Sequence, residues 1–181
     1  EYDALMAEHV EGKGFRLAAA PKAGTPEWSQ MLAGMSPDLK NPDGSPRRWF
    51  HGTRSEEDFV DFRRGIGGLV FATRQAKFAE EFALGMYDFS GGRQRPRVMD
   101  LYVAAKKVWD FRNPAHVKEL WDAVPSLKDK WTSQEFFFDS IQAESEDLGE
   151  VLMTDNWGTL ETPENIEAIF EMLGYDAMLL T

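Results

Sequence analysis

Two short segments in the first half of the chain combine residue types that can hold a small polar ligand. The first, residues 48–54, places a His-Gly-Thr triplet at the end of a short aromatic strand. The second, residues 67–73, is a glycine turn that leads into a short apolar strand. Glycine admits close approach to the backbone, and an imidazole supplies both a hydrogen-bond donor and an acceptor. The pair predicts a slot in which backbone amides and one imidazole hold a planar amide and a ribose.

Local patterns predict the elements that position these segments. Residues 41–46 are dense in turn formers and lead into the strand that carries the His-Gly-Thr triplet. After the second segment, apolar spacing predicts a helix over residues 74–86 whose single buried face contains Phe78, Ala79, Phe82 and Ala83. Cap signals predict further helices from Thr25-Pro26, Asn113-Pro114 and Thr162-Pro163, and apolar spacing predicts two more over residues 133–141 and 148–153. Strands are predicted over residues 69–72, 97–103 and 175–180, with a strand or bend at 108–111.

The beginning of the chain has weaker signals. Residues 2–10 carry a faint helical pattern, and residues 11–24 are rich in Gly, Ala and Lys without a clear period. We therefore expect residues 1–24 to form an N-terminal arm or linker and residues 25–181 to form one domain. Because the chain starts at Glu1 and ends directly after a predicted strand, we expect it to be a piece of a longer protein that lacks its last strand.

Composition excludes several classes of protein. The 181 residues contain no cysteine, so neither a disulfide framework nor a thiolate metal site is available. No apolar run approaches the roughly 20 residues that span a bilayer, so no membrane partner is expected. The net charge of −11 repels a polyanion on average, and a nucleic-acid partner would need a local basic patch. Five arginines flank the two segments, and beside a slot they are expected to hold a small phosphate ligand: Arg47, Arg48, Arg54, Arg63 and Arg64.

The order of motifs resembles a known family. Residues 41–53, a turn followed by an aromatic strand ending in His-Gly-Thr, look like the entry to the ADP-ribosyltransferase domains of phage and plasmid polyvalent proteins. Residues 68–72 are similar to that family's second motif, Gly-Ile-Tyr-Phe-Ala/Thr, and residues 101–106 resemble its next strand. Residues 156–161 and 173–178 resemble the late helix and strand. The resemblance covers about residues 25–181 and extends to the poly(ADP-ribose) polymerase and diphtheria-toxin-like superfamily.

The resemblance implies a fold, a cofactor and roles for individual residues. The implied fold is α+β, a split and mostly antiparallel sheet with helices packed outside and an NAD cleft between its halves. NAD is the implied substrate, and no metal is needed. Gly52 would offer its N–H and C=O to the carboxamide, His51 would bind the adenosine ribose, and Thr53 would hold the orientation of His51. The remaining implied contacts are an aromatic wall from Phe71 or Phe82, a pyrophosphate contact from Arg54, and the second-motif positions Gly68 and Val70.

Two departures from the family pattern bear on activity. Val70 stands where the wider class has a stacking Tyr, so stacking must come from Phe82 or another ring. The family's catalytic Glu usually opens the final strand, which is expected beyond Thr181. Glu161 is the nearest acid within a matching motif and is the catalytic candidate beside His51.

The leading functional hypothesis is a mono-ADP-ribosyltransferase, encoded by a phage or mobile element, that modifies a host macromolecule. It would act in the cytoplasm of the bacterial host, associate with the virion before delivery, and contact other parts of a larger phage or mobile-element protein. The first alternative is a degenerate module that keeps the scaffold as a virion or complex component. The second is an NAD glycohydrolase toxin that uses water as the acceptor.

Each single residue also has a purely structural interpretation. His51 is compatible with a strand-end core position, and Gly67-Gly68 with a simple hairpin turn. Phe78 and Phe82 fit an ordinary helical core stripe, and Glu161 fits an acid that favours a helix N-terminus. The ordered set of motifs, rather than any one residue, therefore supports the functional interpretation.

Overall fold

A computed structural model of the chain describes residues 5–10, 14–53, 61–62, 72–84, 96–147, 160 and 162–179. The contacts divide the chain into two compact units, with the boundary between Lys106 and Lys107. Each unit combines helices with a small sheet, so the chain is of the α+β class. The sequence predicted one domain over residues 25–181, and the division after Lys106 was not part of that prediction.

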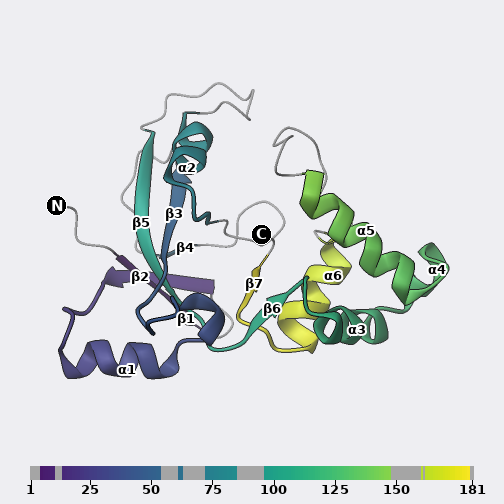
Figure 1. The fold of residues 1–181 in the computed structure, drawn as a ribbon, viewed down its shortest axis with the longest axis horizontal. Helices are drawn as coiled ribbons and strands as arrows, with labels where there is room; N and C mark the ends of the chain where they lie inside the picture. The colour runs from purple at the N-terminus through teal and green to yellow at the C-terminus, as the bar shows by residue number, and fades with distance from the viewer. Residues whose placement is uncertain are drawn as a thin grey trace. The chain divides into compact units, whose positions relative to one another are not determined.

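The first unit is built on a five-stranded sheet with the order β3-β5-β1-β2-β4 (Figure 1). The pairing of β1 with β5 is parallel, and the other three pairings are antiparallel. A helix precedes β3, a short 3-10 turn follows that helix, and a second helix contacts β3. The elements are β1 (Leu5–Val10), β2 (Gly14–Ala19), α1 (Pro26–Gly34), η1 (Pro37–Leu39), β3 (Arg48–Thr53), β4 (Asp61–Phe62), α2 (Ala76–Ala83) and β5 (Arg97–Ala104).

The expected N-terminal arm is where the structure departs most from the sequence prediction. The helical pattern over residues 2–10 was wrong for Leu5–Val10, which form β1, and Gly14–Ala19 form β2. The strand β1 lies in the middle of the sheet, with Leu5 opposite Ala19 on one side and opposite Leu101 on the other. Short apolar runs do not distinguish strand from helix by period alone, and here pairing with β2 on one side and β5 on the other makes the segment a strand.

The predicted start of α1 and the turn before β3 are confirmed. The hydroxyl of Thr25 accepts a hydrogen bond from the Trp28 N–H at 3.3 Å, and Pro26 occupies the first helical position. In the turn, the Asn41 N–H donates to the Ser45 carbonyl at 2.8 Å, and Gly44 has a φ of +82° that favours glycine. These contacts fix where the chain enters β3.

The second unit packs helices around one apolar core. Two parallel strands, β6 and β7, form its small sheet, and α3 contacts α4, α5, η4 and β6 (Figure 1). The core is centred on side chains with no exposed surface, among them Trp109, Val117, Leu120, Phe137, Ile141 and Ile169. The elements are β6 (Val108–Asp110), α3 (Pro114–Ala123), α4 (Pro125–Lys130), α5 (Gln134–Asp147), α6 (Pro163–Glu167), η4 (Ala168–Met172, of π-helical type) and β7 (Ala177–Leu179).

The helix starts predicted in this unit are confirmed. The Asn113 side chain accepts from the Ala115 N–H at 3.0 Å, and the Thr162 hydroxyl accepts from the Asn165 N–H at 3.3 Å. In both cases a proline follows the capping residue in the first turn. The segment 108–110 is a strand rather than a bend. The helix predicted over residues 148–153 and nearly all of the strand predicted over 69–72 lie outside the described residues.

Candidate functional site

The strand β3 carries the three described residues of the His-Gly-Thr triplet at its end. It pairs antiparallel with β5, with His51 opposite Met99, Gly52 opposite Val98 and Thr53 opposite Arg97. Among the strands that the structure describes, it is one of the two end strands of the five-stranded sheet. The triplet therefore stands on a sheet edge, supported from one side by β5.

Hydrogen bonds at Phe50 fix which way the backbone of β3 faces. The Phe50 N–H donates to the Thr73 carbonyl at 2.7 Å, and the Phe50 carbonyl accepts from the Thr73 N–H at 2.9 Å. Both peptide groups of Phe50 thus point away from β5. Because these directions alternate along an antiparallel strand, the N–H and C=O of Gly52 point the same way. The family resemblance implies that these two groups bind a carboxamide, and in the structure they face away from β5.

The Cα of Gly52 faces helix α2 at very short range. A Cβ built on Gly52 would overlap the Ala79 carbonyl oxygen and would lie 2.9 Å from the Ala79 carbonyl carbon and 3.0 Å from the Ala83 nitrogen. The φ of Gly52 is not positive, so its backbone conformation is open to any residue. Glycine is therefore required here by the packing of α2, and the sequence interpretation did not identify that partner.

The side chains of His51 and Thr53 leave the strand on the face opposite to α2. Successive side chains of a strand alternate between faces, so Trp49, His51 and Thr53 share one face while Gly52 points to the other. His51 and Thr53 are half-buried, and Trp49 is buried with 5% of its surface exposed. The Trp49 indole N–H meets no acceptor in the part of the chain that the structure describes. Trp49 thus places a second nitrogen donor on the same face of β3 as His51. The sequence interpretation did not identify it, because nothing in the aromatic segment distinguishes Trp49 from a core residue.

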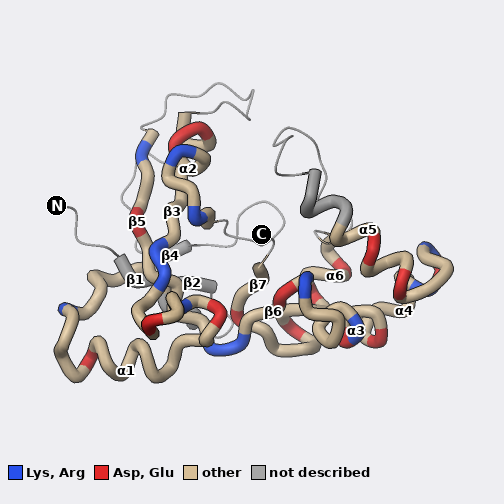
Figure 2. The backbone as a smooth tube through the Cα atoms, in the orientation of Figure 1, with Lys and Arg blue, Asp and Glu red and all other residues tan. Residues whose placement is uncertain are grey.

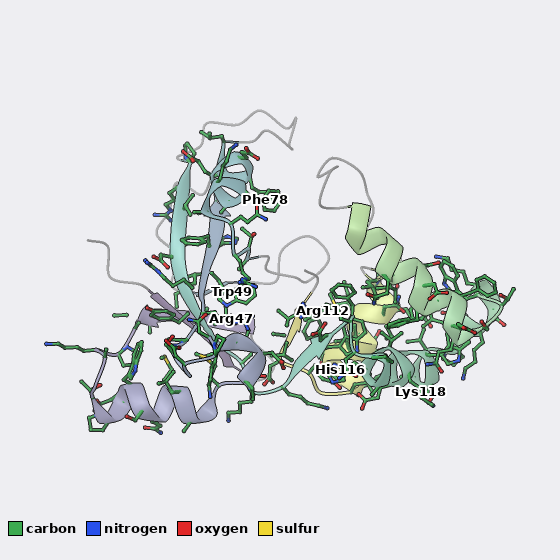
Figure 3. The ribbon with its side chains drawn as sticks, viewed as in Figure 1. Arg47, Trp49, Phe78, Arg112, His116 and Lys118 are labelled. Atoms are coloured by element: carbon green, nitrogen blue, oxygen red, sulfur yellow. The ribbon has the colours of Figure 1, made fainter. Side chains whose placement is uncertain are left out.

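The aromatic residues of α2 do not form the expected buried face. Ala79 and Ala83 are each 2% exposed, whereas Phe82 is 50% exposed and Phe78 is half-buried at the side of the helix (Figure 3). The prediction of one buried face was wrong for Phe82. The reason is the close approach to Gly52, because only the small alanine side chains fit between the helix and β3. An exposed ring at Phe82 is accessible to a ligand or a partner.

Five predicted site residues cannot be placed. Arg54, Gly68, Val70, Phe71 and Glu161 lie outside the described residues. Their roles remain predictions from the family resemblance. His51, Gly52 and Thr53 are the predicted site residues that the described structure brings together on one strand, with Phe82 on the helix that contacts it.

Two of the arginines expected to hold phosphate have partners within the protein. Arg48 forms an ion pair and two hydrogen bonds with Asp100 across the β3–β5 pair, and hydrogen bonding to that carboxylate raises the pKa of the guanidinium. The Arg47 Nε donates to the Lys40 carbonyl at 2.6 Å and closes the turn before β3. Blue and red segments accordingly adjoin where β3 meets β5 (Figure 2). A phosphate ligand would have to displace these contacts.

A separate polar cluster surrounds Tyr175 in the second unit. The Tyr175 hydroxyl donates to Glu119 at 2.6 Å, and Lys107 Nζ lies 4.0 Å from the centre of the ring. Burial, reinforced by the bond to the Glu119 carboxylate, raises the pKa of Tyr175. The His116 ring meets the Tyr175 ring edge-on at 5.3 Å, and its Nδ1 accepts from the Asp110 N–H at 2.9 Å (Figure 3). Every group of this cluster has a structural partner, so it joins β6, α3 and the segment before β7.

A shallow hollow of the second unit lies between α4 and α6. It is lined in part by Ser126, Lys130, Thr162 and Glu164, and the Ser126 hydroxyl donates to Glu164 at 2.5 Å. No residue predicted for the site lines it. Its polar groups cap and join two helices, which is a structural role.

Within the described residues, no three His, Asp or Glu side chains are grouped so that they could hold a metal ion. No helix in the described ranges has the length and apolar character needed to cross a membrane. Comparison of the chain with protein-family models, with curated proteins and with solved structures found no match.

Proposed function

We propose that the chain is a mono-ADP-ribosyltransferase domain that binds NAD along the outer edge of β3. The observation that carries the proposal is the orientation of Gly52, whose N–H and C=O face that edge beside an imidazole. A carboxamide offers one donor group and one acceptor, which match the adjacent N–H and C=O of a single residue. The ordered motifs over about residues 25–181 support the same interpretation.

The proposed chemistry breaks the bond between nicotinamide and ribose. The bonding electrons leave with the nicotinamide, positive charge develops on the ribose, and a nucleophile of the acceptor forms the new bond to the anomeric carbon, as in related glycoside chemistry. Gly52 would hold the leaving group and His51 a ribose hydroxyl, so that the reacting centre is aligned. Thr53 would keep the His51 ring in place, and Phe82 would cover the nicotinamide ring. The carboxylate that stabilises the positive charge is predicted to be Glu161 or an acid of the family's final strand.

A host macromolecule is the proposed acceptor, inside a bacterial cytoplasm. This part of the proposal rests on the resemblance to phage and plasmid polyvalent proteins. The net charge of −11 favours a protein acceptor over a nucleic-acid surface, since a polyanion is repelled on average.

A second candidate is a degenerate module of the same fold that serves as a virion or complex component. One observation favours it, namely that the packing of α2 alone requires glycine at position 52. The glycine is therefore compatible with a scaffold that has lost its ligand. Val70 at the usual position of the stacking Tyr points the same way.

Calorimetric titration of NAD into the wild-type chain, His51→Ala and His116→Ala tests the proposal. His116 lies in the second unit and is the matched control. Loss of one neutral hydrogen bond, about 0.5–1.5 kcal/mol, should raise the Kd of His51→Ala roughly 2- to 12-fold. His116→Ala should bind like wild type. Thermal melting of all three proteins shows whether each is folded.

The outcomes separate the candidates. Absence of NAD binding by a folded wild-type chain would refute the transferase proposal and leave the structural module. Equal affinity of wild type and His51→Ala would refute the role of His51. With NAD labelled in its adenosine part, label on a macromolecule indicates transfer, and release of nicotinamide without labelled macromolecule indicates hydrolysis instead.

A further inference from the structure

Helix α2 and the residues just before it contact β3 at two points, one on the edge of the strand and one on its face. At one point, Phe50 and Thr73 exchange two backbone hydrogen bonds of 2.7 and 2.9 Å. At the other, the Cα of Gly52 faces the Ala79 carbonyl and the Ala83 nitrogen, with no room for a side chain. Thr73 lies just before α2, and its hydroxyl accepts from the Gln75 N–H at 3.1 Å. The segment from Thr73 to Ala83 is therefore attached to β3 both before the helix and along it.

The groups that face Gly52 belong to the backbone of the helix. The Ala79 carbonyl and the Ala83 N–H are one hydrogen-bonding pair of the i to i+4 ladder. Such groups cannot rotate away as a flexible side chain can. The distance between α2 and β3 thus determines where Gly52 lies along the direction perpendicular to the sheet. That distance depends on the size of the side chains at positions 79 and 83, each 2% exposed.

The geometry points to Ala79 and Ala83 as positioning residues for the NAD site, acting through Gly52. This inference rests on the proposed function. The two alanines contact the Cα side of Gly52, while the N–H and C=O proposed to hold the carboxamide face the outer edge. Extra bulk between helix and strand would displace the Gly52 peptide, and a displacement of about 1 Å at a positioning group can cost on the order of 100-fold in activity.

Three variants test the inference by separating bulk from helix stability. Ala79→Val adds two methyl groups between α2 and β3. Glu80→Gly weakens the same helix at an exposed position through its backbone entropy and adds no bulk. Ala76→Val makes the same Ala-to-Val change at an exposed position, the first residue of the same helix. NAD affinity is measured by calorimetry, Tm by thermal melting, and the amide resonance of Gly52 by NMR without ligand.

We expect Ala79→Val to raise the Kd for NAD at least about tenfold and to shift the Gly52 amide resonance. Glu80→Gly and Ala76→Val should keep the Kd within about twofold of wild type, although Glu80→Gly lowers the Tm by several degrees. If Ala79→Val does not fold, Ala79→Ser makes a smaller change of the same kind. The Kd of Ala79→Ser for NAD should then be higher than that of wild type, and its Gly52 amide resonance should be shifted from the wild-type position.

Equal Kd values for Ala79→Val and Glu80→Gly would overturn the inference, because affinity would then follow helix stability. An unshifted Gly52 resonance in Ala79→Val would overturn it as well. If the folded wild-type chain binds no NAD, the proposed function fails, and the Gly52 resonance still decides whether Ala79 positions that peptide.

Discussion

The replacement Gly52→Ala tests the most consequential contact of the first unit. A Cβ at this position would overlap the Ala79 carbonyl oxygen and lie 2.9 Å from its carbon, and real Cβ atoms essentially never approach closer than 3.0 Å. Both atoms belong to the helix backbone, so α2 must move off β3. Overpacking of this kind typically costs about 1–3 kcal/mol, and we expect a loss near 3 kcal/mol because no flexible side chain can yield. For a domain of about 100 residues that lowers the Tm by roughly 12–24 °C.

Urea denaturation followed by circular dichroism measures this loss, with Gly34→Ala as the matched control. A Cβ on Gly34, the last residue of α1, would meet nothing within 4 Å, and its φ is not positive. We expect Gly34→Ala to be neutral or to stabilise the protein by about 0.4–1 kcal/mol, through the unfolded state. If Gly52→Ala and Gly34→Ala have equal free energies of unfolding, the close packing of α2 on β3 is refuted.

Two further predictions concern charged groups. The pKa of tyrosine in an unfolded chain is about 10, and below that pH Tyr175 is protonated in both the folded and the unfolded state. Because the folded protein raises the pKa of Tyr175, the unfolded chain loses this proton first as the pH rises above about 10. The free energy of unfolding therefore falls as the pH increases from there. Denaturation of wild type and Tyr175→Phe between about pH 8 and 11 should show a steeper decline in stability for wild type, and parallel declines would contradict the buried environment of Tyr175. For the exposed pair Arg48–Asp100, a double-mutant cycle should give a coupling of about 0.2–1 kcal/mol that disappears in about 1 M salt, and a larger coupling that persists in salt would contradict a solvent-screened pair.

Local signals predicted the helix starts well, because a cap is a contact between neighbours in the sequence. Thr25, Asn113 and Thr162 each accept a backbone hydrogen bond from a residue two or three positions later. The strand β1 was missed for the opposite reason. One of its two pairing partners, β5, lies far along the chain, and the six residues of β1 are too few for apolar spacing to separate a strand from a helix.

The sequence singled out position 52 but did not reveal what packs against it. The sequence indicated that position 52 needs glycine for close approach, and the structure shows close approach of the α2 backbone. Hydrophobic spacing suggested that Phe82 packs inward, whereas the alanines occupy that place. Apolar periodicity identifies a buried helix face by the hydrophobicity of its residues and carries no information on how closely two backbones approach. It therefore does not identify small residues, such as these alanines, at a tight contact.

Gly52 is constrained on two sides at once, so variants at different positions around it test different parts of the proposal. Its Cα side is fixed by Ala79 and Ala83, so a glycine at this position is required whether or not a ligand binds. Its N–H and C=O face the outer edge of β3, where packing on α2 makes no demand on them. The functional argument therefore depends on His51, whose side chain leaves the strand on the face opposite to α2. A variant at His51 tests the ligand, a variant at Gly52 tests the scaffold, and a variant at Ala79 tests whether the two are coupled.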